Sequence, residues 1–339
     1  MLRPLLLILM ALAVAGCEGA PKPLQIHGVN FVGVSVADLE KTTAFYGEST
    51  NLQPFEVDAS GMAQAVHTLA EGDASLLGER LLRSSNAQLR IMQFSATASA
   101  GPTPVNGPGI AHVCYQVNGE TQTYPLMLEK GGVPIGSPEM VRINDRNPVD
   151  YAYLHDPDGI IVEVEHVDVA ALNLEEPPAN DYRIRHVSLA TPDMGAMLSF
   201  YSHLLAGQKP RRAGRFLKLS GEKLDKVSGL PDTEIQMAWF QIRNLELELV
   251  HYHSHPPARS AEARPINATG YNMIVFDVHD LDGVQELVLD AGGILVGEPR
   301  EVDGGKIQFG RDPDGNLLGF QVTEAGAAVS SSNFKNNGL

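Results

Sequence analysis

Histidine and glutamate residues alternate with apolar residues in several short runs of this sequence. Successive side chains of a strand point to opposite faces, so each run would place its polar side chains on one face. Imidazole and carboxylate groups can bind a divalent metal ion or transfer protons, although each could equally be a structural histidine or a glutamate that faces solvent. The groups that would share a face are His112 with Cys114 and Gln116, Glu163 with Glu165, and Glu246 with Glu248.

Three further histidines, His251, His253 and His255, also alternate and resemble a metal cluster. They precede Pro256-Pro257, which predicts a loop. A metal site is therefore less favoured there than in the strands. Cys114 lies within an apolar run, and a buried, unreactive thiol is its expected state.

A tight turn precedes the strand that carries Glu163. Asp156-Pro157-Asp158-Gly159 has the residues of a turn, and the alternating run that follows predicts a hairpin. The same turn recurs as Asp312-Pro313-Asp314-Gly315, but Gly319 stands where the first copy has Glu163. The second copy therefore has no carboxylate at this position and cannot repeat the role of Glu163.

The recurrence belongs to a duplication of nearly the whole chain. Asp38, Phe45 and Tyr46 match Asp193, Phe200 and Tyr201 at an offset of 155, and Gly131-Gly132 match Gly292-Gly293 at an offset of 161. Each copy divides into two units of the pattern βαβββ. We predict an α+β fold of four such units in two domains, residues 25–167 and 182–323, with a linker at 168–181 and a disordered tail at 324–339.

The N-terminus predicts export. Residues 1–16 have a basic residue and an apolar run too short to span a bilayer, as in a secretory signal peptide. The run ends in Val14-Ala15-Gly16-Cys17, which resembles a bacterial lipobox. Acylation of Cys17 would anchor the protein through a tether at 17–24 in the bacterial cell envelope, facing the periplasm or the exterior. The net charge of -16 and the absence of a dense Lys/Arg run argue against a nucleic acid or an anionic membrane surface as partner. A small molecule is the expected ligand, and the N-terminal acyl chains are the only expected membrane contact.

Residues 25–323 resemble the vicinal oxygen chelate superfamily, on the strength of the four βαβββ units, the Asp…Phe-Tyr helix start and the Asp-Pro-Asp-Gly turns. This superfamily includes glyoxalase I, methylmalonyl-CoA epimerase, extradiol dioxygenases, and fosfomycin and bleomycin resistance proteins. The resemblance implies that units pair to form cup-shaped, mixed sheets. Each unit would then offer a residue on its first strand and one on its last to a metal ion in the cup.

When the family's metal-facing positions are placed on this sequence, the four units differ in the number of metal ligands that they would supply. The inner units would supply His112, Glu163, His186 and Glu248, whereas the outer units have Phe31, Arg90, Met273 and Gly319. If units pair in chain order, each cup holds half a site. If the second unit pairs with the third and the first with the fourth, all four ligands meet at one ion, and the complementary pattern favours this arrangement. Phe31, Arg90 and Met273 would then line a second, apolar cup, unless Arg90 pairs with a neighbouring carboxylate.

Two imidazoles and two carboxylates suit Zn, Ni, Co, Mn or Fe without choosing among them. The resemblance implies a lyase or isomerase of the glyoxalase I type, in which the ion polarises a carbonyl and stabilises an enediolate while Glu163 or Glu248 transfers the proton. An extradiol-type dioxygenase that leaves Glu248 unbound is an alternative. So is a lipoprotein that sequesters a small molecule without turnover, or an envelope scaffold.

Overall fold

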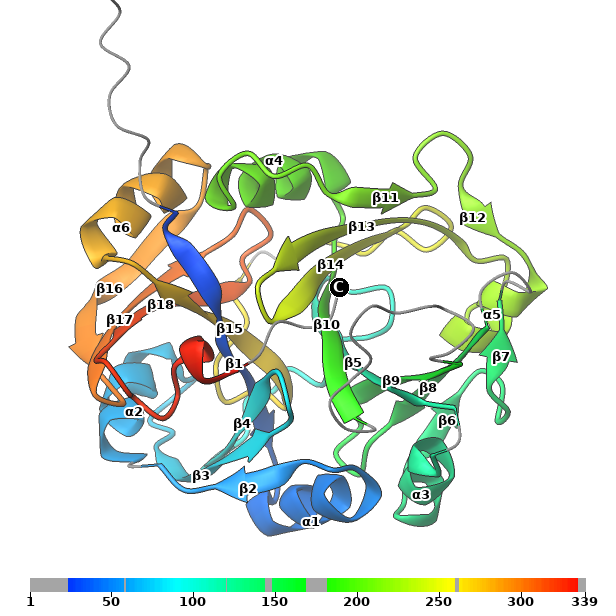
Figure 1. Ribbon diagram of the computed structural model, residues 1–339, viewed down its shortest axis with the longest axis horizontal. Helices are drawn as coiled ribbons and strands as arrows, with labels where there is room; N and C mark the ends of the chain where they lie inside the picture. Colours follow the sequence, from blue (N-terminus) through cyan, green and yellow to red (C-terminus); the bar gives the residue numbers. More distant parts are fainter. Residues whose placement is uncertain are drawn as a thin grey trace, which may run out of the picture.

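The computed structural model describes residues 24–57, 59–119, 121–143, 148–168, 182–259 and 262–334. It confirms the predicted α+β class and the four units (Figure 1). The first unit comprises β1 Ile26–Val36, α1 Leu39–Ser49, β2 Gln53–Phe55, α2 Ala59–Val66, η1 His67–Leu69, β3 Leu76–Arg83 and β4 Gln88–Phe94. The second comprises β5 Gly109–Asn118, α3 Thr123–Glu129, β6 Val133–Ile135, β7 Val141–Arg142, β8 Val149–His155 and β9 Ile161–Val167.

The second half of the chain repeats this plan. The third unit comprises β10 Tyr182–Ala190, α4 Met194–Leu204, β11 Arg211–Ala213, β12 Leu219–Ser220, α5 Glu222–Ser228, β13 Glu234–Ile242 and β14 Leu245–Tyr252. The fourth comprises β15 Gly270–Val278, α6 Leu281–Asp290, β16 Ile294–Glu301, β17 Gly305–Arg311, β18 Leu317–Thr323 and η2 Ser331–Asn333. The Asp-Pro-Asp-Gly turns join β8 to β9 and β17 to β18 as antiparallel hairpins, as predicted.

The strands form two sheets, and each sheet takes units from both halves of the chain. One sheet has the order β16-β17-β18-β15-β1-β4-β3-β2, and the other has β11-β13-β14-β10-β5-β9-β8-β6. Antiparallel ladders β1–β15 and β5–β10 join the units at the centre of each sheet, and the adjoining pairs β1–β4, β5–β9, β10–β14 and β15–β18 are parallel. The favoured arrangement is therefore confirmed: the first unit pairs with the fourth, and the second with the third.

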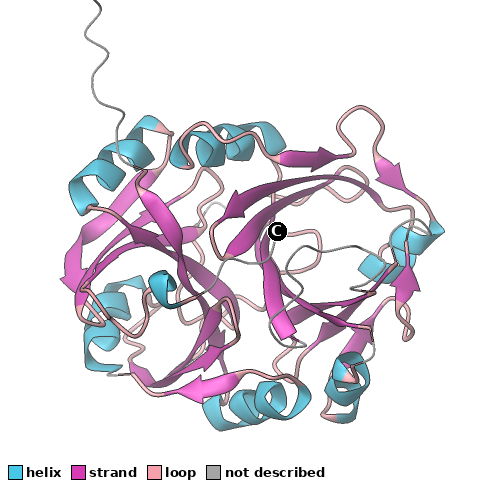
Figure 2. Ribbon diagram, in the orientation of Figure 1, coloured by secondary structure: helices cyan, strands magenta, loops and turns pink. Residues whose placement is uncertain are grey.

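Helices α1, α3, α4 and α6 follow the opposite rule and pack in pairs within each half of the chain. Helix α1 contacts α3, and α4 contacts α6. Two buried hydrogen bonds reinforce these packings, because Tyr46 donates to Asp156 at 3.0 Å and Tyr201 donates to Asp312 at 2.9 Å. The duplicated tyrosine and the duplicated turn aspartate are thus partners. Figure 2 shows the helices around the outside of the two curled sheets.

The main apolar core includes residues from all four central strands, among them Val34, Val113, Val187 and Ile274. The turn after β3 and the turn after β13 also meet there. The side-chain amide of Asn86 donates to the carbonyl of Asn244 at 2.6 Å, and that of Asn244 donates back at 2.9 Å. The two sheets are therefore fixed to each other by polar as well as apolar contacts.

The expectation of a disordered tail at 324–339 is wrong for residues 324–334. Ser331 is buried and donates to Asn30 and Asp277, and Phe334 is also buried. Small polar residues can be ordered when strands such as β1 and β15 supply partners for their backbone and hydroxyl groups. Cys17 lies outside the described residues. Among the described helices, none is long and apolar enough to cross a membrane.

Candidate metal centre

Strand register brings four polar side chains to the centre of the second sheet. In the β5–β10 ladder His112 lies opposite Ser188, and His186 lies opposite Cys114. The flanking strands complete the arrangement, because β14 places Glu248 beside Ser188 and β9 places Glu163 beside Cys114. His112 and Glu248 therefore lie in one row across the sheet with Ser188 between them, and His186 and Glu163 lie in a second row with Cys114 between them. The two rows have nearly two-fold symmetry.

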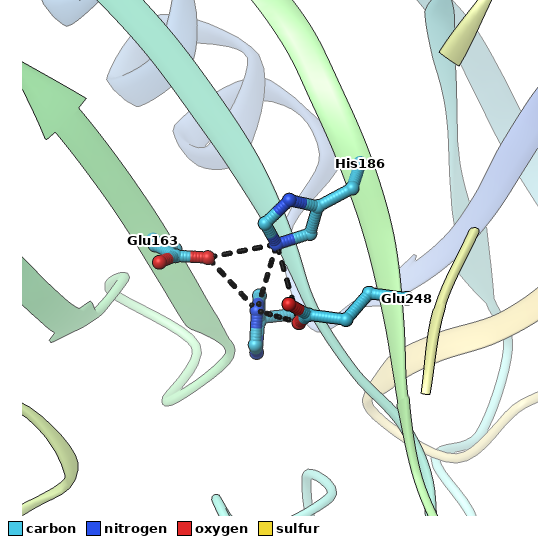
Figure 3. Close-up of side chains that lie close together, drawn as sticks. Glu163, His186 and Glu248 are labelled. Carbon is cyan, nitrogen blue, oxygen red and sulfur yellow. Dashed lines mark hydrogen bonds and ion pairs between the residues drawn. The ribbon is translucent and has the colours of Figure 1, made fainter. Parts of the chain in front are cut away.

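The four side chains converge on one point (Figure 3). Glu163 Oε2 lies 3.0 Å from His112 Nε2 and 2.8 Å from His186 Nε2, whereas Glu248 Oε2 lies 3.5 and 3.4 Å from the same atoms. The two Nε2 atoms are 3.3 Å apart. The structure thus brings together the four residues that the family resemblance singled out.

These separations fit the coordination sphere of a metal ion. Ligand bonds of about 2.0–2.2 Å place neighbouring donor atoms roughly 2.9–3.5 Å apart in octahedral or tetrahedral geometry. The Oε2 atoms of Glu163 and Glu248 are buried, and neither receives a hydrogen bond of suitable geometry from a described residue. A shared cation would satisfy both oxygens and both imidazole lone pairs, so the donor set fits a divalent metal.

Without a cation, the four groups can balance their charges only by holding protons. Burial opposes charge on His112, but the adjacent carboxylates of Glu163 and Glu248 outweigh burial and raise its pKa to about 9. Burial likewise opposes a raised pKa for His186, yet the same carboxylates raise it. Burial favours the neutral carboxyl groups, but the two imidazoles lower the pKa values of Glu163 and Glu248. The metal-free site therefore favours carboxylate anions beside protonated imidazoles, and a divalent cation could take the place of those protons.

A cavity of about 350 Å³ opens onto this cluster. Glu163, His186 and Glu248 lie at its wall, together with Tyr153, Trp239 and Tyr252. A substrate could therefore reach the four donors from one side and rest its body on aromatic rings. Apolar walls with few convergent polar groups are typical of small-molecule sites.

A β-bulge adds a charged group to the cavity. The β5–β10 register shifts between Ile184 and His186, so Arg185 is an extra residue on β10. Arg185 forms ion pairs with Glu165 and with Glu246, which also contacts Arg211 at 3.2 Å. Sequence analysis missed Arg185, since a bulge of this kind leaves no turn residue in the sequence. Glu246, which shares a strand face with Glu248, forms ion pairs with Arg185 and Arg211 and lies outside the four-residue cluster.

Sequence comparison supports the same ancestry over both halves of the chain. The family described as Glyoxalase/Bleomycin resistance protein/Dioxygenase superfamily matches residues 28–164 and again residues 183–320. This chain belongs to that superfamily. Glyoxalase I and dioxygenases in it are metal-dependent enzymes, and glyoxalase-type homologues use divalent metals.

Solved structures of glyoxalase superfamily proteins share the fold. Glyoxalase I from Zea mays is 16% identical with a TM-score of 0.56, and the alignment covers 87% of this chain and 92% of that chain. A putative dioxygenase from Bacillus subtilis is 11% identical with a TM-score of 0.58, and the alignment covers 90% and 88%. At these identities the likeness shows the fold alone. No curated protein sequence matches this chain significantly.

The other cup of this glyoxalase superfamily chain is filled. Phe31, Arg90 and Met273 are fully buried, and the Arg90 guanidinium lies 5.0 Å from the Phe31 ring centroid. Arg90 forms ion pairs with Glu79 and Asp303, as the alternative interpretation of that residue anticipated. The guanidinium of Arg90 and its two carboxylate partners thus occupy the place in this cup that corresponds to the metal donors of the other cup. Phe31, Arg90 and Met273 are parts of a packed interior in this structure.

The packing around Gly319 leaves no room in this second cup for a metal-binding side chain at that position. A Cβ atom there would lie 2.8 Å from Ile307 Cδ1 and 2.9 Å from Val275 Cγ2.

The histidines His251 and His253 do not join the metal donors. His251 donates through Nδ1 to the Thr191 carbonyl oxygen at 2.8 Å, and its ring packs edge-on against that of His253. Neither belongs to a described group of three or more metal donors.

Proposed function

We propose that this protein is a divalent-metal-dependent lyase or isomerase that moves a proton between adjacent carbon atoms of a small carbonyl compound. The observation that carries the proposal is the convergence of His112, Glu163, His186 and Glu248 at the inner end of a cavity. A lone cluster of buried glutamates would be unfavourable, whereas a cluster that binds an ion is stable. The same fold and site would also suit a protein that binds its ligand without turnover.

The four side chains would have two tasks. His112 and His186 would hold the metal with one or both glutamates, and the ion when bound would polarise the substrate carbonyl and acidify the neighbouring C–H bond. Glu163 or Glu248 would take that proton on one carbon and return it to the next. Both carboxylates reach the cavity wall, so either has access to a substrate. The aromatic walls would exclude water from the proton transfer.

Charge balance favours an uncharged substrate. The cavity is lined by the carboxylates of Glu163, Glu165 and Glu248 and by the guanidinium groups of Arg185 and Arg211, both of which pair with the carboxylate of Glu246 behind the wall. Four negative and two positive charges sum to a net charge of about -2, which one divalent ion cancels. Because no cation in this set is left uncompensated, we infer that the site takes neutral carbonyl compounds with an aromatic or apolar body.

The proposal includes the cellular setting. The sequence Val14-Ala15-Gly16-Cys17 supports acylation of Cys17 and attachment to the bacterial cell envelope, with the catalytic cavity in the periplasm or the exterior. Mass spectrometry of the purified full-length protein from a bacterial host tests this part, because processing at Cys17 and acylation change the mass of the N-terminal peptide.

Metal analysis of the purified full-length protein tests the site. The wild type should contain one divalent ion per chain, and His112→Ala and His186→Ala should each lose it. His253→Ala is the control, because it removes a partly buried histidine that lies outside the cluster of four buried donors. Loss of metal in only one of the two site variants would contradict a shared ion.

Proton transfer can then be tested with the metal-loaded protein. A panel of neutral 2-oxoaldehydes and hydroxyketones is incubated in D₂O, and deuterium incorporation beside the carbonyl is followed by NMR. We expect exchange with the wild type. Of the variants Glu163→Gln and Glu248→Gln, the one that replaces the proton carrier should lose exchange and keep its metal. Full metal content without exchange or turnover on any compound would favour the sequestering protein instead.

A further inference from the structure

The loop between β11 and β12 presents two large apolar side chains to solvent. Phe216 and Leu217 are each 86% exposed, more than any other large hydrophobic residue in the described parts of the chain. They are consecutive residues of the loop 214–218 between β11 and β12, and this loop projects from the molecule in Figure 1. Adjacent exposed apolar residues on a projecting tip are unusual for a soluble surface and indicate a contact with another phase or molecule.

The same segment is strongly basic. Residues 209–218 contain Lys209, Arg211, Arg212, Arg215 and Lys218 and no acidic residue, although the whole chain has a net charge of -16. Arg215 lies beside the tip, with its guanidinium 5.0 Å from the Phe216 ring centroid. An apolar tip surrounded by cations has the composition of a segment that enters the headgroup region of an anionic bilayer.

The position of the loop fits a membrane surface on this side of the molecule. Figure 1 shows the loop rising from the side of the molecule at which the chain enters β1. Cys17 precedes Leu24 by seven residues, which can span about 25 Å when extended. The flanks of the loop, Ala213 and Leu219, line the catalytic cavity. A membrane that receives the tip would therefore lie next to the mouth of the cavity.

We propose that the β11–β12 loop docks on an anionic phospholipid bilayer, with Phe216 and Leu217 inserted among the headgroups and Arg212, Arg215 and Lys218 bound to lipid phosphates, whereas Arg211 stays paired with Glu246. The acyl anchor belongs to the proposed function, and the loop adds a second contact that fixes the orientation of the body. The cavity mouth then faces the lipid surface, where neutral apolar compounds concentrate.

Site-specific fluorescence tests the docking. The full-length acylated protein carrying Leu217→Cys is labelled with the environment-sensitive dye NBD and reconstituted in vesicles of phosphatidylcholine with 30% phosphatidylglycerol, with and without doxyl-labelled lipid. Leu77→Cys is the control, because Leu77 is also exposed but lies on β3 in the other sheet. We expect several-fold stronger quenching at position 217 than at position 77, and weaker quenching in pure phosphatidylcholine or high salt.

Flotation of the same vesicles reports the anchor separately. Protein that floats while positions 217 and 77 are quenched equally overturns the docking proposal and leaves the anchor intact. Protein that fails to float shows that the acyl anchor is absent, and quenching at position 217 with freely added vesicles still decides the loop. A blue shift at position 217 that depends on protein concentration and not on vesicles also overturns it, since the tip would then bind a second copy of the chain.

Discussion

Metal affinity should depend steeply on pH, because protons and the ion compete for the same imidazole lone pairs. His112 has a pKa of about 9 in the metal-free protein, raised by Glu163 and Glu248 against the effect of burial. Below that pH the ion must displace a proton before it binds to Nε2. Affinity is therefore expected to rise with pH and to level off near pH 9.

The pKa of His112 sets the size of the effect. At pH 7 the group is two units below its pKa of about 9, so its proton weakens metal binding about 100-fold, or about 2.7 kcal/mol. One displaced proton gives a tenfold change in Kd per pH unit. The pKa of His186 is raised as well, so the observed slope should exceed that value wherever both rings are charged.

Competition with a chelator at pH 6.5 to 9.5 measures this slope, and calorimetry in two buffers of different ionisation enthalpy counts the protons released. Glu163→Gln is the informative variant, because loss of one carboxylate lowers the pKa of His112 and should shift the steep region to lower pH. An affinity that is constant from pH 6.5 to 9, after correction for the chelator, would refute the reasoning.

Three further predictions concern stability. Arg90→Met removes the buried guanidinium that pairs with Glu79 and Asp303 and should lower the free energy of unfolding by about 3–5 kcal/mol in urea titrations, with metal content unchanged; a loss of metal would show that the two cups are coupled. Burial raises the pKa of Asp156 to about 6, so its folded form keeps a proton that the unfolded chain releases, and this group should lower stability by up to about 3 kcal/mol from pH 4 to 7. Burial also raises the pKa of Asp312 to about 6, so Asp156→Asn should remove one of two similar contributions; a variant that loses as much stability over this range as the wild type contradicts the prediction. Gly319→Ala should cost about 1–3 kcal/mol by overpacking, measured as a lower Tm, and an unchanged Tm would show that the second cup can expand.

Much of the architecture could be predicted from local patterns. The Asp-Pro-Asp-Gly turns announce hairpins, and Asp38 and Asp193 accept the helix-capping hydrogen bonds that their positions suggest. Alternation within strands correctly put His112 and Cys114 on one face. These features depend on neighbours in sequence, so the sequence carries them directly.

Features that depend on distant partners were harder to predict. The pairing of units could be argued only from the complementary placement of His112, Glu163, His186 and Glu248, since ladders between remote strands leave no local signal. The Arg185 bulge and the packing of Ser331 on Asn30 have the same character. In each case the partner lies dozens to hundreds of residues away, and only the folded chain selects it.

The exchange of strands between the two halves has a mechanical consequence. Because β1 pairs with β15 and β5 pairs with β10, the first and second halves clasp each other at two ladders. A single break in the backbone between the halves would leave both ladders intact, and the two fragments should remain associated as one complex. Neither half expressed alone contains more than one imidazole and one carboxylate of the metal centre. Mixing the separately made halves should therefore restore metal binding, which makes the chain a natural split reporter.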